Sequence, residues 1–261
     1  MIIDSNSLSV ITPAFAAGVI VLLSHIPLGR EVVKRGIIFI DLAIAQMAGF
    51  GIILANTLGF EAEGWQLQGL AFFSAISGAA LIGILEKFSG DFQEAVIGIS
   101  FVLAASASLM LLANNPHGGE HLQDLLSGQI LWVSWDQLIA PALVSLLVFA
   151  VWLFKRRWVQ GKLFYLFFSI AITQSVQLVG VYLVFSSLIM PAVATIRLTD
   201  KKALLAAMII GLCAYGSGLL LSLISDLPSG ALIVWTMLAW ALAFKALNKV
   251  PGSRLQPANI F

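Results

Sequence analysis

The sequence predicts an all-α, polytopic membrane protein built as a single transmembrane domain over residues 1–261. Hydrophobic residues make up 60% of the 261 positions and charged residues only 10%, whereas a soluble domain carries about 25% charged residues. The mean hydropathy is +0.99. A folded chain with so few polar groups cannot cover its surface in water. This excludes a soluble enzyme, a nucleic-acid-binding protein and a disordered chain.

Apolar stretches indicate the number of membrane segments, because a helix needs roughly 20 apolar residues to cross the bilayer. The N-terminus has no basic region ahead of its first apolar stretch, so we expect a retained helix there and not a cleaved signal peptide. A shorter apolar piece, 181–198, is predicted as either a ninth, short span or a re-entrant segment. The eight long spans are expected at about 8–28, 36–58, 65–85, 93–113, 136–154, 163–179, 203–224 and 229–245.

The distribution of charge predicts the orientation. With the N-terminus outside and nine crossings, every Lys and Arg falls in an inner loop or in the C-terminal tail, which is then cytoplasmic. The positive-inside rule favours this arrangement, and eight crossings would break it. The charged residues of the outer segments are then all acidic: Asp4, Glu61, Glu63, Glu120, Asp124, Asp136 and Asp226.

Asp41 is the main polar candidate inside the membrane, where an ionisable group is costly and therefore a functional candidate. In one interpretation it lines a solute path, with Gln46 near it. In the other it pairs with Lys34 or Arg35, or caps the start of a helix at the inner surface. The residues alone leave both interpretations open.

The outer loop between the fourth and fifth spans carries metal-type ligands. His117, Glu120, His121 and Asp124 supply the nitrogen and oxygen atoms that borderline metals accept. The spacing also fits the H-x-x-E-H peptidase motif, but the Gly-Gly pair inside it disfavours the helix that this motif needs. An open metal-capture site and a solvated loop without a metal both remain possible.

Two absences in the sequence narrow the function further. The single Cys213 excludes an intramolecular disulfide and a cysteine-based zinc site. The chain has no G-x-x-x-x-G-K-[ST] loop, so it does not bind a nucleotide by that route. Active transport would therefore take its energy from another subunit.

Five stretches, in order over residues 25–240, resemble one known family. They are PLGREVVKRGIIFIDLAIAQMAG, FQEAVIGISF, LLSGQILWVSWDQL, VGVYLVFSSLIMPAVATIRL and DLPSGALIV. Together they resemble the ABC-3 family, the permease subunits of bacterial ABC transporters for zinc, manganese or iron(II). Each stretch alone is weakly specific, whereas the ordered set covers nearly the whole chain.

The resemblance implies a non-enzymatic permease of the bacterial cytoplasmic membrane that imports a divalent metal, Zn(II) or Mn(II) before others, as its substrate. It implies a homodimer, two cytoplasmic ATPase subunits and an extracytoplasmic metal-binding protein, with no cofactor bound by this chain and no nucleic acid. The expected contact with the ATPase is the stretch around Met190, Pro191, Ala192, Thr195 and Arg197.

The sequence departs from this family at its intramembrane metal ligands. Members carry an aspartate and, four residues later, a histidine on the same helix face. Asp41 matches the aspartate, but the fourth residue after it is Ala45, and Gln46 follows one position out of phase. Either the helix contains a one-residue shift, or the histidine is missing and His117, Glu120 and His121 compensate outside.

The leading interpretation is a metal importer in which Asp41 and Gln46 line the path and the outer acids attract cations. Two alternatives stay open. The same architecture could carry a metal chelate or a small organic cofactor, or the chain could be a structural or assembly membrane protein without an ATPase.

Overall fold

The computed structural model describes residues 5–58, 65–89, 93–112, 130–161, 163–225 and 227–248. All regular structure in these ranges is helical. The helices are α1 (Ser5–Arg35), α2 (Ile40–Thr57), α3 (Trp65–Ser89), α4 (Gln93–Leu112), the 3-10 turns η2 (Ile130–Trp132) and η3 (Asp136–Leu138), α6 (Ile139–Phe154), α7 (Arg156–Val159), α8 (Phe164–Val179), α9 (Val181–Ala194), α10 (Asp200–Ser225) and α11 (Ser229–Leu247).

The described part of the chain contains seven helices that are long and apolar enough to cross a membrane, and two shorter apolar helices. The expected long span at 163–179 is a 16-residue helix, α8, so the prediction of eight long spans is wrong at this segment. The expected short segment 181–198 is the 14-residue helix α9. Gly180 separates the two with φ 83°, a conformation that residues with a side chain rarely adopt.

The first helix is longer than the sequence predicts. α1 runs to Arg35 with Pro13 and Pro27 inside it, where the expected span ended near residue 28. Leu28 and Val32 are fully buried, so the turns after Pro27 remain packed against the rest of the protein. As a result Arg30, Lys34 and Arg35 project from helix and not from a loop.

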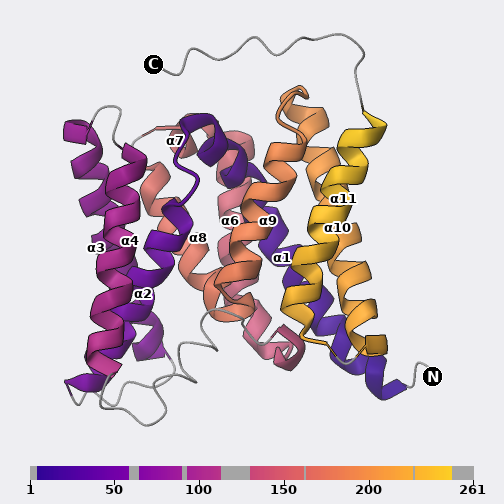
Figure 1. The fold of residues 1–261 in the computed structure, drawn as a ribbon, viewed down its shortest axis with the longest axis horizontal. Coiled ribbons are helices and arrows are strands. Elements are labelled where there is room, and N and C mark those ends of the chain that lie inside the picture. Colours follow the sequence, from indigo (N-terminus) through magenta and orange to yellow (C-terminus); the bar gives the residue numbers. More distant parts are fainter. Residues whose placement is uncertain are drawn as a thin grey trace.

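The helices form two groups, which α6 and α8 join (Figure 1). α2 packs against α3 and α4 in one group, and α1, α9, α10 and α11 pack on one another in the second. α8 contacts α3 on one side and α6 on the other, and α6 also contacts α1. The N-terminal end of α1 and the C-terminal end of α11 lie at opposite ends of the bundle (Figure 1).

Small residues allow the helices of the second group to approach closely. The glycine-rich segment 211–218 of α10 lies at two such close helix contacts. A β-carbon on Gly211 would overlap Leu22 of α1, and one on Gly218 would overlap Ile233 of α11. Among the glycines of the described chain, Gly29 lies closest to the backbone of another helix, because a β-carbon on it would overlap the carbonyl oxygen of Leu188 in α9.

We expect Gly29→Ala to lower the thermal stability of the protein, because the added methyl group meets rigid backbone and forces α1 and α9 apart. Overpacking of this kind costs about 1–3 kcal/mol. Gly98→Ala is the matched control, since open space surrounds Gly98 on α4. Heating the protein in detergent, followed by size-exclusion chromatography, measures both midpoints. Equal midpoints for the two variants would contradict the close approach.

Candidate functional site

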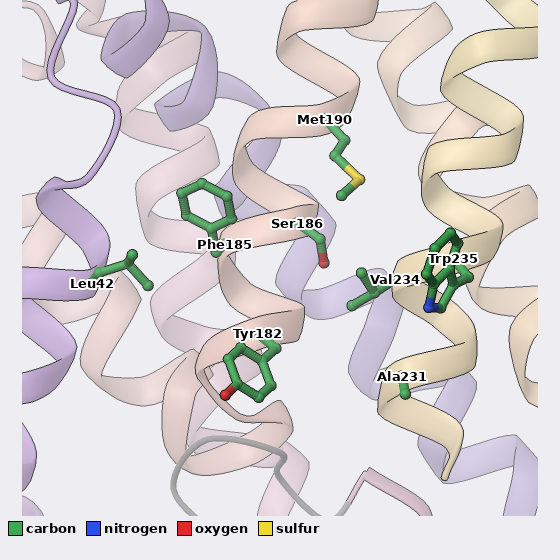
Figure 2. Close-up of a pocket in the computed structure, with 8 residues that line it drawn as sticks. All are labelled: Leu42, Tyr182, Phe185, Ser186, Met190, Ala231, Val234 and Trp235. Carbon is green, nitrogen blue, oxygen red and sulfur yellow. The ribbon is translucent and has the colours of Figure 1, made fainter. Parts of the chain in front are cut away.

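A groove of about 320 Å³ opens between α2, α9 and α11. α9 forms its floor, with α2 on one side and α11 on the other (Figure 2). Phe185 points toward the α2 side of α9, while Ser186 and Met190 point toward α11 (Figure 2). The groove is mostly apolar, and its lining residues are Leu42, Tyr182, Phe185, Ser186, Met190, Ala231, Val234 and Trp235.

Contacts on both faces of α9 hold this floor in place. On the groove side, the Phe185 ring stacks on Phe39, with centroids 6.2 Å apart and planes 7° apart. On the buried side, the hydroxyl groups of Ser187 and Tyr215 lie 3.0 Å apart and share a hydrogen bond. α9 therefore has one face packed on the second helix group and one face turned to the groove.

Asp41 lies in the first turn of α2 and is almost completely buried, at 1% exposure. Neither carboxylate oxygen has a side-chain hydrogen-bond partner. Lys34 pairs instead with Asp200, and Arg35 donates to the Gln160 carbonyl oxygen at 2.8 Å. The structure thus shows neither of the ion pairs that the sequence left possible, although the helix N-terminus itself favours a negative charge at Asp41.

Asp41 is one residue away from the groove and not in its wall, since the adjacent Leu42 lines it. α2 is regular α-helix from Ile40 to Thr57. A one-residue shift between Asp41 and Gln46 is therefore absent. Ala45 occupies the position one turn after Asp41 and is 1% exposed, while Gln46 is half-buried and rotated away from that face.

The predicted outer metal ligands lie outside the described residues. These are His117, Glu120, His121 and Asp124, and the outer acids Glu61 and Glu63 lie outside them as well. Within the described ranges, no group of three or more His, Cys, Asp or Glu side chains could hold a metal ion.

The predicted ATPase-contact stretch divides into buried and exposed parts. Pro191, Ala192 and Thr195 are buried, and Met190 lines the groove. The turn between α9 and α10 comes directly after them and is open to solvent, with Ile196 48% exposed and Arg197 exposed. Within the predicted stretch, this turn is therefore the part that presents an exposed surface to another protein.

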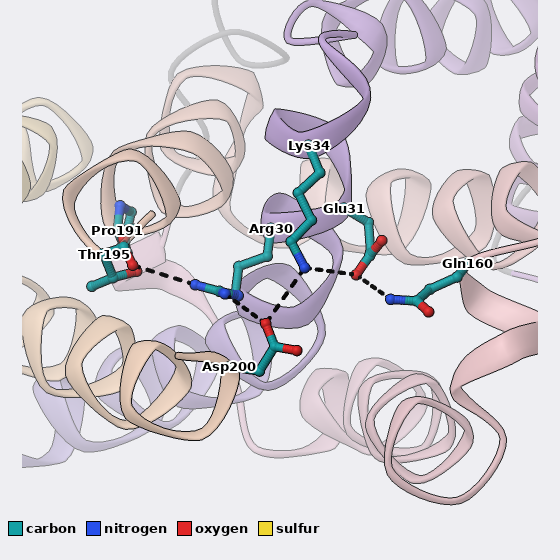
Figure 3. Close-up of polar contacts among 7 residues, drawn as sticks. All are labelled: Arg30, Glu31, Lys34, Gln160, Pro191, Thr195 and Asp200. Atoms are coloured by element: carbon teal, nitrogen blue, oxygen red, sulfur yellow. Dashed lines mark hydrogen bonds and ion pairs between the residues drawn. The ribbon is translucent and has the colours of Figure 1, made fainter. Parts of the chain in front are cut away.

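A polar network surrounds the base of this turn (Figure 3). Arg30 of α1 donates to the Asp200 carboxylate at 2.8 Å and to the Thr195 carbonyl oxygen at 3.4 Å. Lys34 lies 3.4 Å from Asp200 and 3.9 Å from Glu31, which accepts a hydrogen bond from Gln160 at 2.8 Å. Sequence reasoning missed this network and the groove, because both join residues far apart in the chain.

The surface of the bundle identifies the class of protein. Large apolar side chains on α4 and α6 are more than half exposed, among them Leu103, Met110, Leu143 and Leu147. A water-soluble protein does not present such continuous apolar faces. Together with the seven long apolar helices, they define a multi-pass membrane protein.

Comparison with known families then identifies the chain. The sequence profile of the ABC 3 transport family matches residues 7–164 and 158–247. The chain therefore belongs to this family and is a permease subunit of a bacterial ABC transporter, as its sequence motifs predicted.

Similar proteins share most of their length with this chain. The "Probable iron transport system membrane protein" of Haemophilus influenzae is 28% identical over 77% of this chain and 79% of its own. The "Manganese transport system membrane protein MntC" of Halalkalibacterium halodurans is 27% identical over 91% and 87%. Among solved structures, PsaBC from Streptococcus pneumoniae in complex with Fab matches with a TM-score of 0.69 and 19% identity over 89% of both chains, a likeness of fold.

We expect Asp41→Asn to unfold at the same or a higher temperature than the wild type. A buried carboxylate without a side-chain partner is costly, and the neutral amide of similar shape is less so. Asp200→Asn is the contrasting variant, because it removes the negative charge that pairs with the buried Arg30 and should lower stability by about 1 kcal/mol. Thermal unfolding in detergent compares them. A lower midpoint for Asp41→Asn would make its carboxylate a structural anchor.

Proposed function

We propose that this permease imports a divalent metal ion, Zn(II) or Mn(II) before others, across the bacterial cytoplasmic membrane. The family match over nearly the whole chain carries the proposal, and two relatives are named for iron and manganese transport. Asp41 supports it independently, because an unpaired carboxylate buried in a membrane helix has a cost that a role in cation transport explains.

In this proposal the chain crosses the membrane nine times with its N-terminus outside, counting α8 and α9 as short crossings. Opposite placement of the two helical ends of the chain supports an odd number (Figure 1). Two copies would face each other across the groove and enclose the path, so that Asp41 and Gln46 lie close to it. A movement of α2 would then expose Asp41, whose neighbour Leu42 already lines the groove.

Separate ATPase subunits would bind the exposed turn between α9 and α10 and supply the energy. An extracytoplasmic metal-binding protein would deliver the cation to the outer surface, where the acidic segments favour it. His117, Glu120 and His121 would add a capture site in the outer loop. The divalent metal is the transported substrate, and the chain itself would hold no resident cofactor.

A second candidate substrate, a metal chelate, is favoured by one observation. Ala45 fills the position where the family's histidine would complete a metal site with Asp41, and the regular helix rules out a compensating shift. Without that nitrogen ligand, a site built on Asp41 and Gln46 offers only oxygen atoms, which suit harder cations than zinc. The missing nitrogen ligand therefore favours either a chelate as the substrate or, for a free ion, Mn(II) over Zn(II).

We expect Asp41→Ala to reduce metal uptake to the background of cells that lack this chain, because the path loses the carboxylate that this proposal assigns to cation binding. Cells deleted for the chain and complemented with the wild type or the variant would be supplied with radioactive Mn(II), Zn(II) or Fe(II) in turn. Membrane level and ATPase co-purification should match the wild type.

Gln46→Ala is the comparison variant and should retain part of the uptake, since a neutral amide contributes less to cation binding than a carboxylate. Wild-type uptake by Asp41→Ala would remove Asp41 from the mechanism. Uptake of none of the three free ions by wild-type cells would favour the chelate.

A further inference from the structure

We infer that Arg30 is a positioning residue that ties the ATPase-facing turn to α1, so that movement of this turn is transmitted to the groove. The inference rests on the proposed function, in which the turn between α9 and α10 receives the ATPase. It concerns residues that neither contact the solute nor form the exposed surface of the turn.

The Arg30 guanidinium joins three helices at one point. Its two terminal nitrogens reach the carbonyl oxygen of Thr195, at the end of α9, and the carboxylate of Asp200, at the start of α10. The side chain is only 6% exposed. A planar fork of donors can serve two acceptors in different directions, whereas the single ammonium of a lysine is a point charge.

The Thr195 end of this contact belongs to a tightly closed turn. The Thr195 carbonyl also accepts the Leu198 N–H at 3.0 Å, and the Thr195 N–H and hydroxyl both donate to the Pro191 carbonyl, at 3.1 and 2.8 Å. Thr195 is fully buried. Displacement of the exposed Ile196 and Arg197 therefore moves the end of α9 with them, because these hydrogen bonds hold the turn to the last turn of the helix.

The second link between α1 and α9 lies next to the first. Gly29 places its backbone directly against Leu188, one residue before Arg30 in α1 and two turns before Thr195 in α9. Between these two links, α9 carries Met190, which lines the groove. α1 and the cytoplasmic half of α9 thus form one unit, and a shift of the turn changes the groove wall.

Lys34 offers a matched control from the same network (Figure 3). It also approaches Asp200, at 3.4 Å, but its side chain is 42% exposed and it makes no contact with α9 in the network. Exposed ion pairs contribute about 0–1 kcal/mol. Removing the Lys34 charge tests the loss of a positive charge at Asp200 without loss of the tie to Thr195.

The test measures coupling as ions transported per ATP hydrolysed. The permease with its co-purifying ATPase would be reconstituted in proteoliposomes, with Mn(II) and Zn(II) each used as the probe. Arg30→Gln and Asp200→Asn should keep complex formation and basal ATP hydrolysis but lower transport per ATP by about tenfold, the factor that corresponds to 1.4 kcal/mol. Arg30→Lys should lie between, and Lys34→Gln should stay within about twofold of the wild type.

A wild-type ratio of transport to hydrolysis in the Arg30 variants would overturn the inference, and so would an equal fall of both rates. If Arg30→Gln does not assemble, Asp200→Asn decides, because the half-exposed Asp200 can be replaced with less structural cost. Failure of the wild-type complex to transport either ion or to bind an ATPase would instead refute the proposed function. The two failures are therefore distinguishable.

Discussion

The architecture depends on the contact between α1 and α9. α9 has only 14 residues and follows Gly180, which has a positive φ. The helix is shorter than the hydrocarbon core of a bilayer, so its length alone does not fix its position in the membrane. Gly29 allows its backbone to lie directly against α1, and Arg30 fixes its far end to α1 and α10. The groove, the exposed turn and the packing of Tyr215 on Ser187 all follow from the position of this one helix.

This arrangement places the groove wall and the proposed contact with the ATPase on one short helix. The groove side of α9 carries Phe185 and Met190, and its C-terminal end leads into the exposed turn at Ile196 and Arg197. Leu42 lines the other wall, and Asp41 lies buried next to it, where the start of α2 is held to α9 by the Phe39–Phe185 stack. A small displacement of α9 relative to α2 would change both the width of the groove and the exposure of Asp41.

Features that depend on short stretches of the chain could be predicted from the sequence, and contacts between distant residues could not. Apolar length located the seven long helices and the two shorter apolar helices of the described chain, and ordered motifs identified the family, because both signals lie within short stretches. The end of α1 was misplaced, since the basic residues after Pro27 resemble a loop while Leu28 and Val32 keep the helix packed. The pairing of Arg30 with Asp200 spans 170 positions, and no local pattern reports it. The sequence left two explanations for Ala45 and Gln46, and only the regular backbone of α2 separates them.

The most direct test of the central claim measures thiol reactivity in the groove. In a Cys213→Ser background, Met190→Cys would be treated with a water-soluble methanethiosulfonate reagent, with the complex either free of nucleotide or trapped with ATP and vanadate. Leu188→Cys, at a fully buried position on the same helix, is the control. The account predicts that Met190→Cys reacts and that its rate changes between the two states, while Leu188→Cys stays protected. A rate at Met190→Cys that does not respond to nucleotide would contradict the claim that α9 connects the ATPase-facing turn to the path.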